Sequence, residues 1–431
     1  MSYEAAVQYL YGLQKFGIKF GLSKTSNLLE SLGNPQQGQS YIHIGGTNGK
    51  GSVAAFLASI LEKAGLKVGL YSSPHLVRFT ERFRVNQTEM DPDTASTLIS
   101  ELKSVIVPEE PPTFFEATTA MALTHFAREK TDVAILEVGM GGRLDATNVI
   151  KPLVTVITNI SMEHQAYLGN RLLHIAREKA GIIKAGVDVL TAARQPSVIR
   201  LFDAVCREKG TPLWRSGRDF RYRRQNGLLH YTGMTHHLKK LRLGLLGGFQ
   251  FRNAALAIAA SERLEARGYG ISEEHIRSGL HDVRWAGRMH VVQRDPLIIL
   301  DGSHNPAAIK ALVDTIRRDF RYKRLILVLG IMADKAIGDM VRKIVPLADH
   351  VFYTRPLYSR AAEPDVLYNL AVPMKKPGTI VPLLSDALDQ AVSLAGSEDL
   401  VLICGSLFTV GEALIHFDPV NFSPDFVMDE P

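Results

Sequence analysis

A glycine-rich segment at residues 45–52, with the sequence GGTNGKGS, carries the clearest chemical pattern in the chain. It follows an apolar run at 41–44 and opens a helical stretch at 52–64, which is the context of a phosphate-binding loop. Glycines let backbone N–H groups converge on phosphate oxygens at a helix N-terminus. Lys50 would neutralise phosphate charge, and the Ser52 hydroxyl would bind Mg²⁺. Unlike the usual loop, Gly51 separates the lysine from the hydroxyl residue.

A carboxylate near this loop would complete a magnesium site, because Mg²⁺ prefers oxygen ligands. Glu137 ends the apolar run 132–136 and precedes the glycine-rich residues 138–143. Ligands of open α/β sheets bind beyond the carboxyl ends of the strands, which is where Glu137 would lie. Ser73 also follows a predicted strand, but a serine before a proline is commonly only part of a turn.

Two further polar residues have both a chemical and a structural interpretation. His164 follows the predicted strand 153–157, and a lone histidine is more often structural than a ligand. Lys179 precedes Gly181 near a predicted helix end, where a cation is favoured by the helix dipole. Chemistry alone leaves both alternatives open for each residue.

The elements that must position these residues alternate between short apolar runs and amphipathic stretches, as in βαβ units. Strands are predicted at 41–44, 67–71, 132–136 and 153–157, and helices at 52–64, 115–128 and 253–266. A second series begins near residue 285, with strands at 297–300, 325–329, 351–353 and 400–403. We therefore predict an α/β protein with two domains, 1–284 and 285–431, and a reaction centre between them. The tail from residue 417 contains prolines at 419 and 424 and is expected to be loosely held.

Composition narrows the class of protein. With 431 residues the chain exceeds one ordinary hydrophobic core, which also favours two domains. The net charge of +6 favours anionic ligands, but the basic stretch 218–224 is predicted as one strand of a hairpin with its turn at 225–227. Nucleic-acid binding is not expected, and no apolar run is long enough to span a membrane. Two cysteines without metal-type spacing and the absence of a signal-like N-terminus predict a cytoplasmic protein.

Seven segments in order along the chain resemble the folylpolyglutamate synthase/dihydrofolate synthase family, a branch of the Mur ligase superfamily. They are 46–52 (GTNGKGS), 72–76 (SSPHL), 113–116 (TFFE), 137–148 (EVGMGGRLDATN), 178–181 (EKAG), 301–306 (DGSHNP) and 405–407 (GSL). The resemblance implies an N-terminal P-loop ATPase domain with a mostly parallel sheet and a smaller Rossmann-like C-terminal domain. It also implies ATP, L-glutamate and tetrahydrofolate as substrates, dihydropteroate as a further substrate, and a monomeric enzyme.

Site residues follow from the resemblance by position. The family's metal-binding positions fall on Ser52, Ser73, Glu137 and His164, which would hold two Mg²⁺ ions with Glu137 shared. Lys179 falls on the lysine that the family carbamylates, which would replace a cation by an oxygen-bearing anion. ATP-binding positions fall on the loop and on residues from both domains: Thr47, Asn48, Gly49, Lys50, Gly51, Ser52, Asn253, Arg288, Asp301 and His304. Lys50, His164 and Lys179 are the expected catalytic residues.

The folate-binding positions fall on two short segments. They are Thr113, Phe114, Phe115 and Glu116 in the first segment and Leu144, Asp145 and Ala146 in the second. The two phenylalanines could stack on a pterin ring, although adjacent aromatic residues more often place one ring in the core. The chain departs from the family at Glu163, where Asp is common, and at Ala336, where a second acid is common. The second departure leaves the glutamate pocket undefined.

The implied mechanism activates a folate carboxylate as an acyl phosphate, which the amine of glutamate then attacks. No side-chain nucleophile is needed. Two alternatives stay open: a Mur ligase that acts on a peptidoglycan precursor, and a P-loop regulatory ATPase that changes partners with its nucleotide. The pterin-type segments speak against the first alternative, and the motif at 301–306 is unexplained by the second.

Overall fold

The computed structural model describes residues 1–17 and 21–425, and the chain divides into two compact units. The first unit comprises Met1–His75, Phe79–Gly244 and Gln250–Val283. The second comprises Arg284–Pro431 together with two short segments of earlier sequence, Leu76–Arg78 and Leu245–Phe249. Sequence periodicity could place the main division near 285, but it carried no signal for the two short segments.

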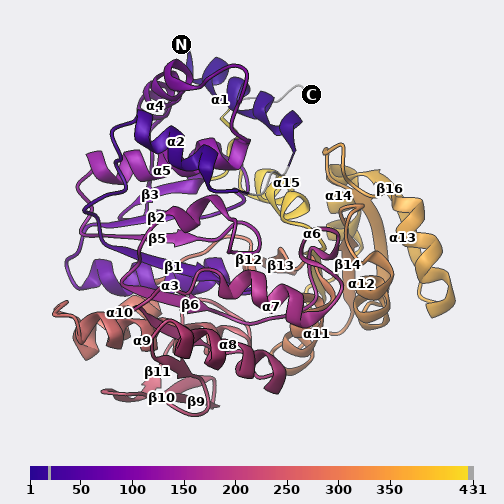
Figure 1. The fold of residues 1–431 in the computed structure, drawn as a ribbon. Helices are drawn as coiled ribbons and strands as arrows, with labels where there is room; N and C mark the ends of the chain where they lie inside the picture. The colour runs from indigo at the N-terminus through magenta and orange to yellow at the C-terminus, as the bar shows by residue number, and fades with distance from the viewer. Residues whose placement is uncertain (18–20, 426–431) are drawn as a thin grey trace. The chain divides into compact units, whose positions relative to one another are not determined.

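The first unit is built on an eight-stranded sheet of order β4-β3-β2-β5-β1-β6-β7-β8 (Figure 1). All of its pairings are parallel except those of β3, which is antiparallel to both of its neighbours, β2 and the edge strand β4. Every residue of β1 and β5 is buried, which explains their continuous apolar sequence. The strands are β1 Tyr41–Gly45, β2 Val68–Tyr71, β3 Phe83–Val85, β4 Thr88–Glu89, β5 Val133–Glu137, β6 Val154–Ile157, β7 Asp188–Thr191 and β8 Leu213–Arg215.

Helices flank this sheet, and their buried stripes explain where they pack. In α8, for example, Val198, Phe202 and Cys206 recur at helical spacing and join the core that covers β6 and β7. The α-helices of the unit are α1 Tyr3–Gly12, α2 Ser23–Ser31, α3 Lys50–Lys63, α4 Pro92–Val105, α5 Phe114–Arg128, α6 Gln165–Leu168, α7 Leu172–Ala180, α8 Pro196–Glu208, α9 Gln250–Glu265 and α10 Glu273–Asp282. Short 3₁₀ helices are η1 Leu13–Phe16, η2 Phe79–Arg82 and η3 Ala146–Val149.

A small antiparallel sheet of order β11-β10-β9 also belongs to the first unit and packs beside α9 (Figure 1). Its strands are β9 Arg221–Gln225, β10 Leu228–Thr232 and β11 His237–Leu241. The predicted hairpin is confirmed, because Asn226 and Gly227 both take positive φ angles, 51° and 75°, in the turn between β9 and β10. The third strand was not predicted.

The second unit has a six-stranded sheet of order β12-β13-β17-β14-β15-β16, parallel except for the edge strand β12. Its strands are β12 His290–Arg294, β13 Leu297–Asp301, β14 Leu325–Leu329, β15 His350–Arg355, β16 Gly378–Leu383 and β17 Leu400–Cys404. Its α-helices are α11 Pro306–Asp319, α12 Ile337–Ile344, α13 Pro364–Ala371, α14 Leu384–Leu394 and α15 Leu407–Phe417, with 3₁₀ helices η4 Val345–Leu347 and η5 Val372–Met374.

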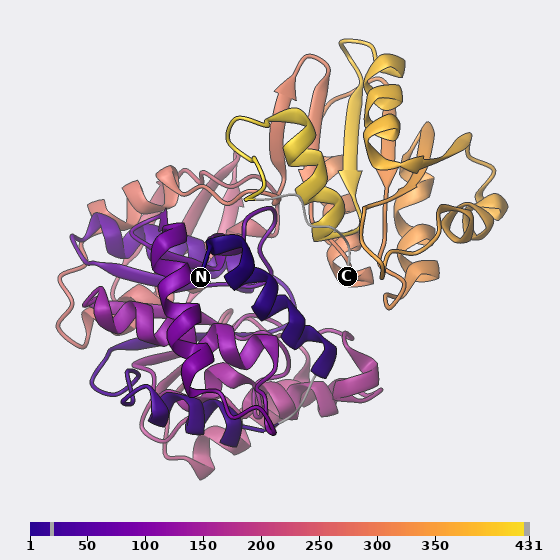
Figure 2. The ribbon, with the colours of Figure 1, turned by 90° about the horizontal axis from the view of Figure 1, so that it is seen from above.

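Alternate residues of these strands feed two different cores. Leu325, Leu327 and Leu329 of β14 pack with α11, α12 and α13, whereas Ile326 and Val328 pack with α14 and α15. Helices therefore cover both faces of this sheet, as Figure 2 shows. This is the doubly covered α/β architecture expected from the alternating sequence pattern.

The first residues of the tail are held more firmly than predicted. Arg78 Nη1 donates to the Asn421 carbonyl at 3.0 Å, and the Phe422 ring lies against His290 with the ring centroids 6.1 Å apart. A proline-rich composition did not reveal these contacts, because their partners are distant in sequence. Residues 426–431 of the predicted loose tail lie outside the described residues. Among the residues that are described, no helix is long and apolar enough to cross a membrane.

Candidate nucleotide and ligation site

The predicted phosphate loop connects β1 to α3, and two of its glycines cannot be replaced without strain. Gly46 and Gly49 have φ angles of +130° and +87°, a region that favours glycine. A Cβ atom on Gly46 would lie 2.0 Å from Oγ1 of Thr158, and one on Gly49 would lie 2.6 Å from Oδ1 of Asn253. Backbone conformation and close neighbours thus both require glycine in this loop.

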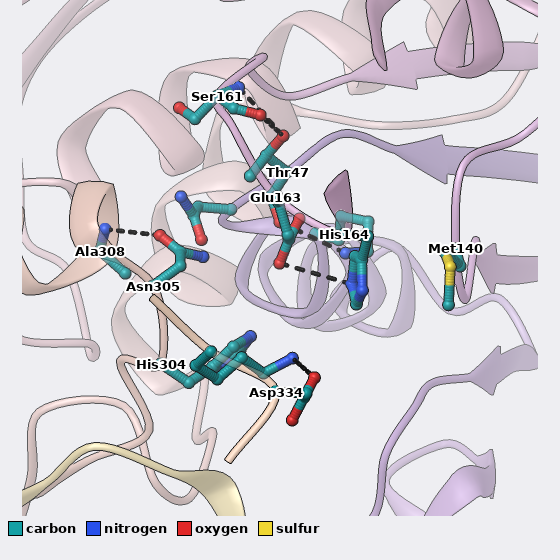
Figure 3. Close-up of polar contacts among 12 residues, drawn as sticks. Thr47, Met140, Ser161, Glu163, His164, His304, Asn305, Ala308 and Asp334 are labelled. Carbon is teal, nitrogen blue, oxygen red and sulfur yellow. Dashed lines mark hydrogen bonds and ion pairs between the residues drawn. The ribbon is translucent and has the colours of Figure 1, made fainter. Parts of the chain in front are cut away.

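The loop is held in place by the residues that follow β6. The Thr47 hydroxyl donates to the Ser161 carbonyl at 3.2 Å and accepts from the Ser161 N–H at 3.1 Å, as Figure 3 shows. Asn159 accepts from the Asn48 N–H at 3.1 Å and donates to the Asn48 carbonyl at 2.8 Å. The Thr158 hydroxyl donates to the same carbonyl at 2.8 Å. These residues were not predicted, although their place at the carboxyl end of a strand was an available signal.

The first turn of α9 meets the loop from another direction. Asn253 donates to Oε1 of Gln250 at 2.8 Å, and Gln250 Nε2 donates to the Ser52 hydroxyl at 3.2 Å. Within the described residues, the buried Oδ1 atom of Asn253 has no hydrogen-bond partner. An unpaired buried acceptor beside Gly49 indicates a place for a donor from a ligand. Gln250 was missed, because only the fold brings it to Ser52.

Glu137 lies beside the loop at the end of β5. It is paired in register with Ile44 of β1, and its side chain is 7% exposed. Its carboxylate lies 3.9 Å from the Lys50 ammonium and accepts from the Ser73 N–H at 3.4 Å. The structure therefore brings Lys50, Ser73 and Glu137 together at the carboxyl edge of the sheet.

Lys179 reaches the same loop from α7. Its side chain is buried, and Nζ donates to the Gly46 carbonyl at 2.8 Å. Burial lowers the pKa of Lys179 to about 8, with the charge of Lys50 acting in the same direction and those of Glu163 and Asp145 opposing it. About a tenth of such side chains carry a neutral amine at pH 7, far more than for an ordinary lysine.

His164 enters from the loop after β6, with its backbone in the left-handed region at φ 49°. Its Nε2 atom lies 3.7 Å from Oε1 of Glu163, the pair drawn in Figure 3. Among the described residues there is no group of three or more His, Cys, Asp or Glu side chains that could hold a metal. The predicted metal site is of a different kind, because it combines two hydroxyl groups with one carboxylate and one histidine.

The first folate-type segment begins α5 and is partly structural. The Thr113 hydroxyl accepts from the Glu116 N–H at 3.2 Å, and the buried Glu116 carboxylate accepts from the Thr113 N–H at 2.7 Å. This reciprocal pair is a capping box. The carboxylate of Glu116 therefore has a local partner, which the sequence pattern Thr-x-x-Glu could have indicated.

The two phenylalanines of this segment are both half-buried, so neither is simply a core residue. Phe114 stacks on Tyr11 with ring centroids 5.4 Å apart, and the guanidinium of Arg82 lies 5.1 Å from its centroid. Phe115 lies against Tyr71 with centroids 5.9 Å apart.

A polar chain that the sequence did not reveal extends from this aromatic cluster. Arg82 Nε donates to Nδ1 of His75 at 2.8 Å, and the other ring nitrogen of His75 lies 3.2 Å from the Tyr11 hydroxyl. Burial lowers the pKa of His75 well below its ordinary value, and the charge of Arg82 lowers it further. His75 is therefore neutral, with Nδ1 as the acceptor for Arg82.

The second folate-type segment, Leu144 to Ala146, is fixed through Asp145. Its buried carboxylate accepts from the Met140 N–H at 2.8 Å and from the Thr147 N–H and hydroxyl at 3.0 and 2.5 Å. The Thr147 hydroxyl also lies 2.8 Å from Nε2 of the buried His43. Burial raises the pKa of Asp145. Asp145 thus shapes the loop after Glu137, whatever else it contacts.

The predicted nucleotide residues of the second unit gather at the end of β13. The buried Asp301 carboxylate accepts from the Met289 and Ser303 N–H groups, both at 3.0 Å. Nδ1 of His304 lies 2.8 Å from the Gly302 carbonyl, and Asn305 caps α11 by accepting from the Ala308 N–H at 2.9 Å, as Figure 3 shows. A Cβ atom on Gly302 would lie 2.6 Å from Nη1 of Arg288, so the predicted Arg288 belongs to the same group.

Both units match known domains. Residues 44–261 match the Mur ligase middle domain, and residues 287–407 match the Mur ligase glutamate ligase domain. The fold, the phosphate loop and these two matches therefore place the chain in the Mur ligase superfamily.

Relatives and solved structures make the family specific. A dihydrofolate synthase/folylpolyglutamate synthase of Bacillus subtilis is 34% identical over 95% of this chain and 98% of its own length, and one of Escherichia coli is 34% identical over 96% and 94%. The E. coli enzyme in complex with DHPP and ADP superposes with a TM-score of 0.89 at 34% identity, covering 96% of this chain and 98% of that one. The chain belongs to the folylpolyglutamate synthase/dihydrofolate synthase family, whose members are ATP-dependent ligases that add glutamate to folates.

Some relatives are longer. A bifunctional folylpolyglutamate synthase/dihydropteroate synthase of Halobacterium salinarum is 37% identical over 96% of this chain, and a protein of the same name from Haloferax volcanii is 35% identical over 96%. The chain spans only about half the length of these two curated relatives, 51% and 50%.

Proposed function

We propose that this chain joins L-glutamate to tetrahydrofolate, extending a polyglutamate tail, and also joins glutamate to dihydropteroate. The observation that carries the proposal is the approach of Lys50 and Ser73 to Glu137 at the exit of a glycine loop. A lysine, a buried carboxylate and a phosphate loop at one sheet edge suit phosphoryl transfer from a nucleotide. Family membership supplies the acceptor chemistry.

ATP is the proposed nucleotide, in agreement with the ADP bound in the E. coli complex and the ADP and AMPPCP complexes of the Mycobacterium tuberculosis enzyme. Loop N–H groups would bind the phosphates. The unpaired Oδ1 atom of Asn253 would accept a hydrogen bond from a donor group of the nucleotide. The second unit would contribute Arg288 and His304 to the nucleotide and would bind glutamate. Within that unit, Asp301 is occupied in shaping its own loop, so we assign it a positioning role.

Mg²⁺ is the proposed metal, and three of the four proposed ligands, Ser52, Ser73 and Glu137, supply oxygen atoms that fit it. Hydroxyl and carboxylate oxygens are the ligands that a hard cation prefers. Ser52, Ser73, Glu137 and His164 would hold two ions. Bound Mg²⁺ would offset the negative charge that phosphate oxygens carry during phosphoryl transfer.

Lys179 is the proposed carbamylated residue. Its neutral amine can attack CO₂ at carbon, lose one proton and become a carbamate. In the unmodified protein, burial and the charge of Lys50 disfavour the Lys179 ammonium, which is why its pKa is lowered. A carbamate would place an anion beside Lys50 and offer oxygen atoms to a metal.

For the folate, we propose that Phe114, Phe115 and the loop 144–146 contact the pterin part. Phe114 already offers a stacked ring and a neighbouring guanidinium. Glu116 and Asp145 would act indirectly, since both carboxylates hold local backbone N–H groups.

The proposed reaction has two balanced steps. A carboxylate oxygen of the folate attacks the γ-phosphorus of ATP, the bond to the bridging oxygen breaks, and ADP leaves. The amine of glutamate then attacks the acyl carbon, the carbon–oxygen bond to phosphate breaks, and one proton is lost. In this scheme Lys50 stabilises charge on the phosphoryl group.

Parallel ligation assays test the proposal. Supplied with ATP, Mg²⁺ and labelled glutamate, the enzyme should form labelled products from tetrahydrofolate and from dihydropteroate. If tetrahydrofolate gives labelled product and dihydropteroate does not, the proposed dihydrofolate synthase activity is wrong. Labelled product from neither acceptor would overturn the proposed function.

A further inference from the structure

Two buried amide side chains of α9 face the helix that follows the phosphate loop. Gln250 and Asn253 lie three residues apart on one face of α9, and their exposed fractions are 0% and 1%. Asn253 Nδ2 donates to Oε1 of Gln250 at 2.8 Å, and Gln250 Nε2 donates to the hydroxyl of Ser52 on α3 at 3.2 Å. We call this hydrogen-bonded chain of three residues the amide relay.

The amide relay fixes which end of the Asn253 amide faces the phosphate loop. A side-chain amide has one oxygen that accepts hydrogen bonds and one NH₂ group that donates them. Because the NH₂ group of Asn253 is turned to Gln250, its Oδ1 atom is turned to the other side, where a Cβ atom on Gly49 would lie 2.6 Å from it. The orientation of this oxygen therefore depends on Gln250.

The Oδ1 atom of Asn253 indicates that the amide relay serves a ligand. Within the described residues this buried oxygen has no hydrogen-bond partner. A buried acceptor without a partner is costly, so a pair of amides that only joined α9 to α3 would be more stable with this oxygen bonded as well. A bound molecule that supplies a donor beside the phosphate loop would remove this cost.

The other end of the amide relay presents the hydroxyl of Ser52. Since its oxygen accepts from Gln250, the hydroxyl proton and the second lone pair point elsewhere. A hydroxyl proton suits a phosphate oxygen, which is an acceptor, whereas Oδ1 of Asn253 requires a donor. Ionised phosphate groups carry no donor. The donors of ADP and ATP are the ribose hydroxyl groups and the amino group of the base.

We propose that Gln250 is a positioning residue that couples the two ends of the nucleotide site, an inference that rests on the proposed ATP-dependent function. It holds Asn253 with Oδ1 towards a donor of the nucleoside part, and it holds Ser52 with its proton available to a phosphate oxygen. Gln250 acts through these two neighbours. Without it both side chains would remain but could turn, so nucleotide binding would weaken.

The test measures the Kd for ADP by calorimetry with Gln250→Met in two backgrounds. Methionine resembles glutamine in length and flexibility but cannot replace its amide. We expect Gln250→Met to raise the Kd by about tenfold in the wild type. Added to Ser52→Ala/Asn253→Ala, it should change the Kd by less than about twofold, because the groups through which Gln250 acts are gone. A tenfold effect in both backgrounds would overturn the positioning role.

Kinetics and a matched glutamine supply controls. Gln250→Met should raise KM for ATP by about tenfold and leave KM for tetrahydrofolate within about twofold. Gln36→Met changes a half-buried glutamine in the segment before β1 and should match the wild type. If Gln250→Met does not fold, Gln250→Ala removes the same amide without adding volume. Wild-type ADP affinity in a folded Gln250 variant, or equal rises in both KM values, would contradict the proposal.

Removal of Mg²⁺ identifies the donor that Asn253 meets. Asn253→Ala should weaken ADP binding to the same degree in Mg²⁺ and in EDTA, because the donor belongs to the nucleotide. An effect seen only with Mg²⁺ would place the donor on a metal-bound water and overturn that part of the proposal. Wild-type protein that binds ADP, with the expected effects of the variants, but forms no ligation product would refute the proposed function and leave the role of Gln250 intact.

Discussion

At the scale of single residues, Lys179 shows how an environment prepares a side chain for chemistry. Its ammonium group is buried, holds the Gly46 carbonyl and lies near the charge of Lys50, so its pKa falls to about 8. A carbamate on Lys179 would be a buried anion, so it would be stable only if a neighbouring positive charge compensates it. Lys50 and the proposed metal would provide that compensation.

The first prediction concerns the pH dependence of Lys179 modification. A lowered pKa means that the neutral amine, which attacks CO₂, becomes more abundant as pH rises through about 8. At a fixed concentration of dissolved ¹³CO₂, carbamate should form several-fold faster at pH 8.5 than at pH 7. Carbon-13 NMR of the labelled protein measures this rate directly.

Two variants control that experiment. Lys179→Met should lose the carbamate signal and the ligase activity while keeping its fold. Lys184→Met alters a half-buried lysine that donates to the Asn148 carbonyl, and it should keep the signal. A Lys179→Met protein that turns over normally would remove the carbamate from the mechanism.

At the scale of elements, the start of α5 shows that a residue assigned to the ligand by resemblance can have a structural role. Resemblance assigned Glu116 to the folate site, but its carboxylate closes a capping box with Thr113. Such caps stabilise proteins by about 0.5–2 kcal/mol.

We therefore expect Glu116→Ala to lower the free energy of unfolding by about 1 kcal/mol, measured by urea denaturation. Glu110→Ala, which changes an exposed residue shortly before the helix, should have little effect. An unchanged stability together with a large rise in KM for tetrahydrofolate would show that Glu116 acts mainly as a ligand contact.

The elements also show what sequence can and cannot reveal. The buried strands β1, β5, β6 and β14 were predictable because parallel strands covered on both faces have continuous apolar runs. The short strands β3, β4 and β12, at or next to a sheet edge, were not, since they are half-exposed and carry no strong pattern.

The residues of the site also fall into those that the sequence could predict and those that it could not. Lys50 and Glu137 could be proposed from their places at the ends of predicted strands and loops. Gln250 and His43 could not, because each reaches its partner through folding of segments far apart in the sequence. Arg82 likewise reaches Phe114 only through the fold. Local patterns thus identify residues that follow strands, whereas supporting contacts require the tertiary structure.

At the scale of the whole molecule, two α/β units each place polar residues at the carboxyl ends of their parallel strands. The first holds the glycine loop with Glu137, and the second holds Asp301 and His304. A chain that used only its phosphate loop as a switch would not need the glutamate ligase domain matched at residues 287–407. Coupling of ATP cleavage to ligation is therefore the central claim.

The most direct test is the ratio of ADP released to glutamate incorporated, measured in one reaction with tetrahydrofolate, ATP and Mg²⁺. We predict one ADP for each glutamate joined, and release near background when either glutamate or tetrahydrofolate is left out. ADP release that proceeds equally well without glutamate or folate would contradict the claim and would favour a regulatory ATPase.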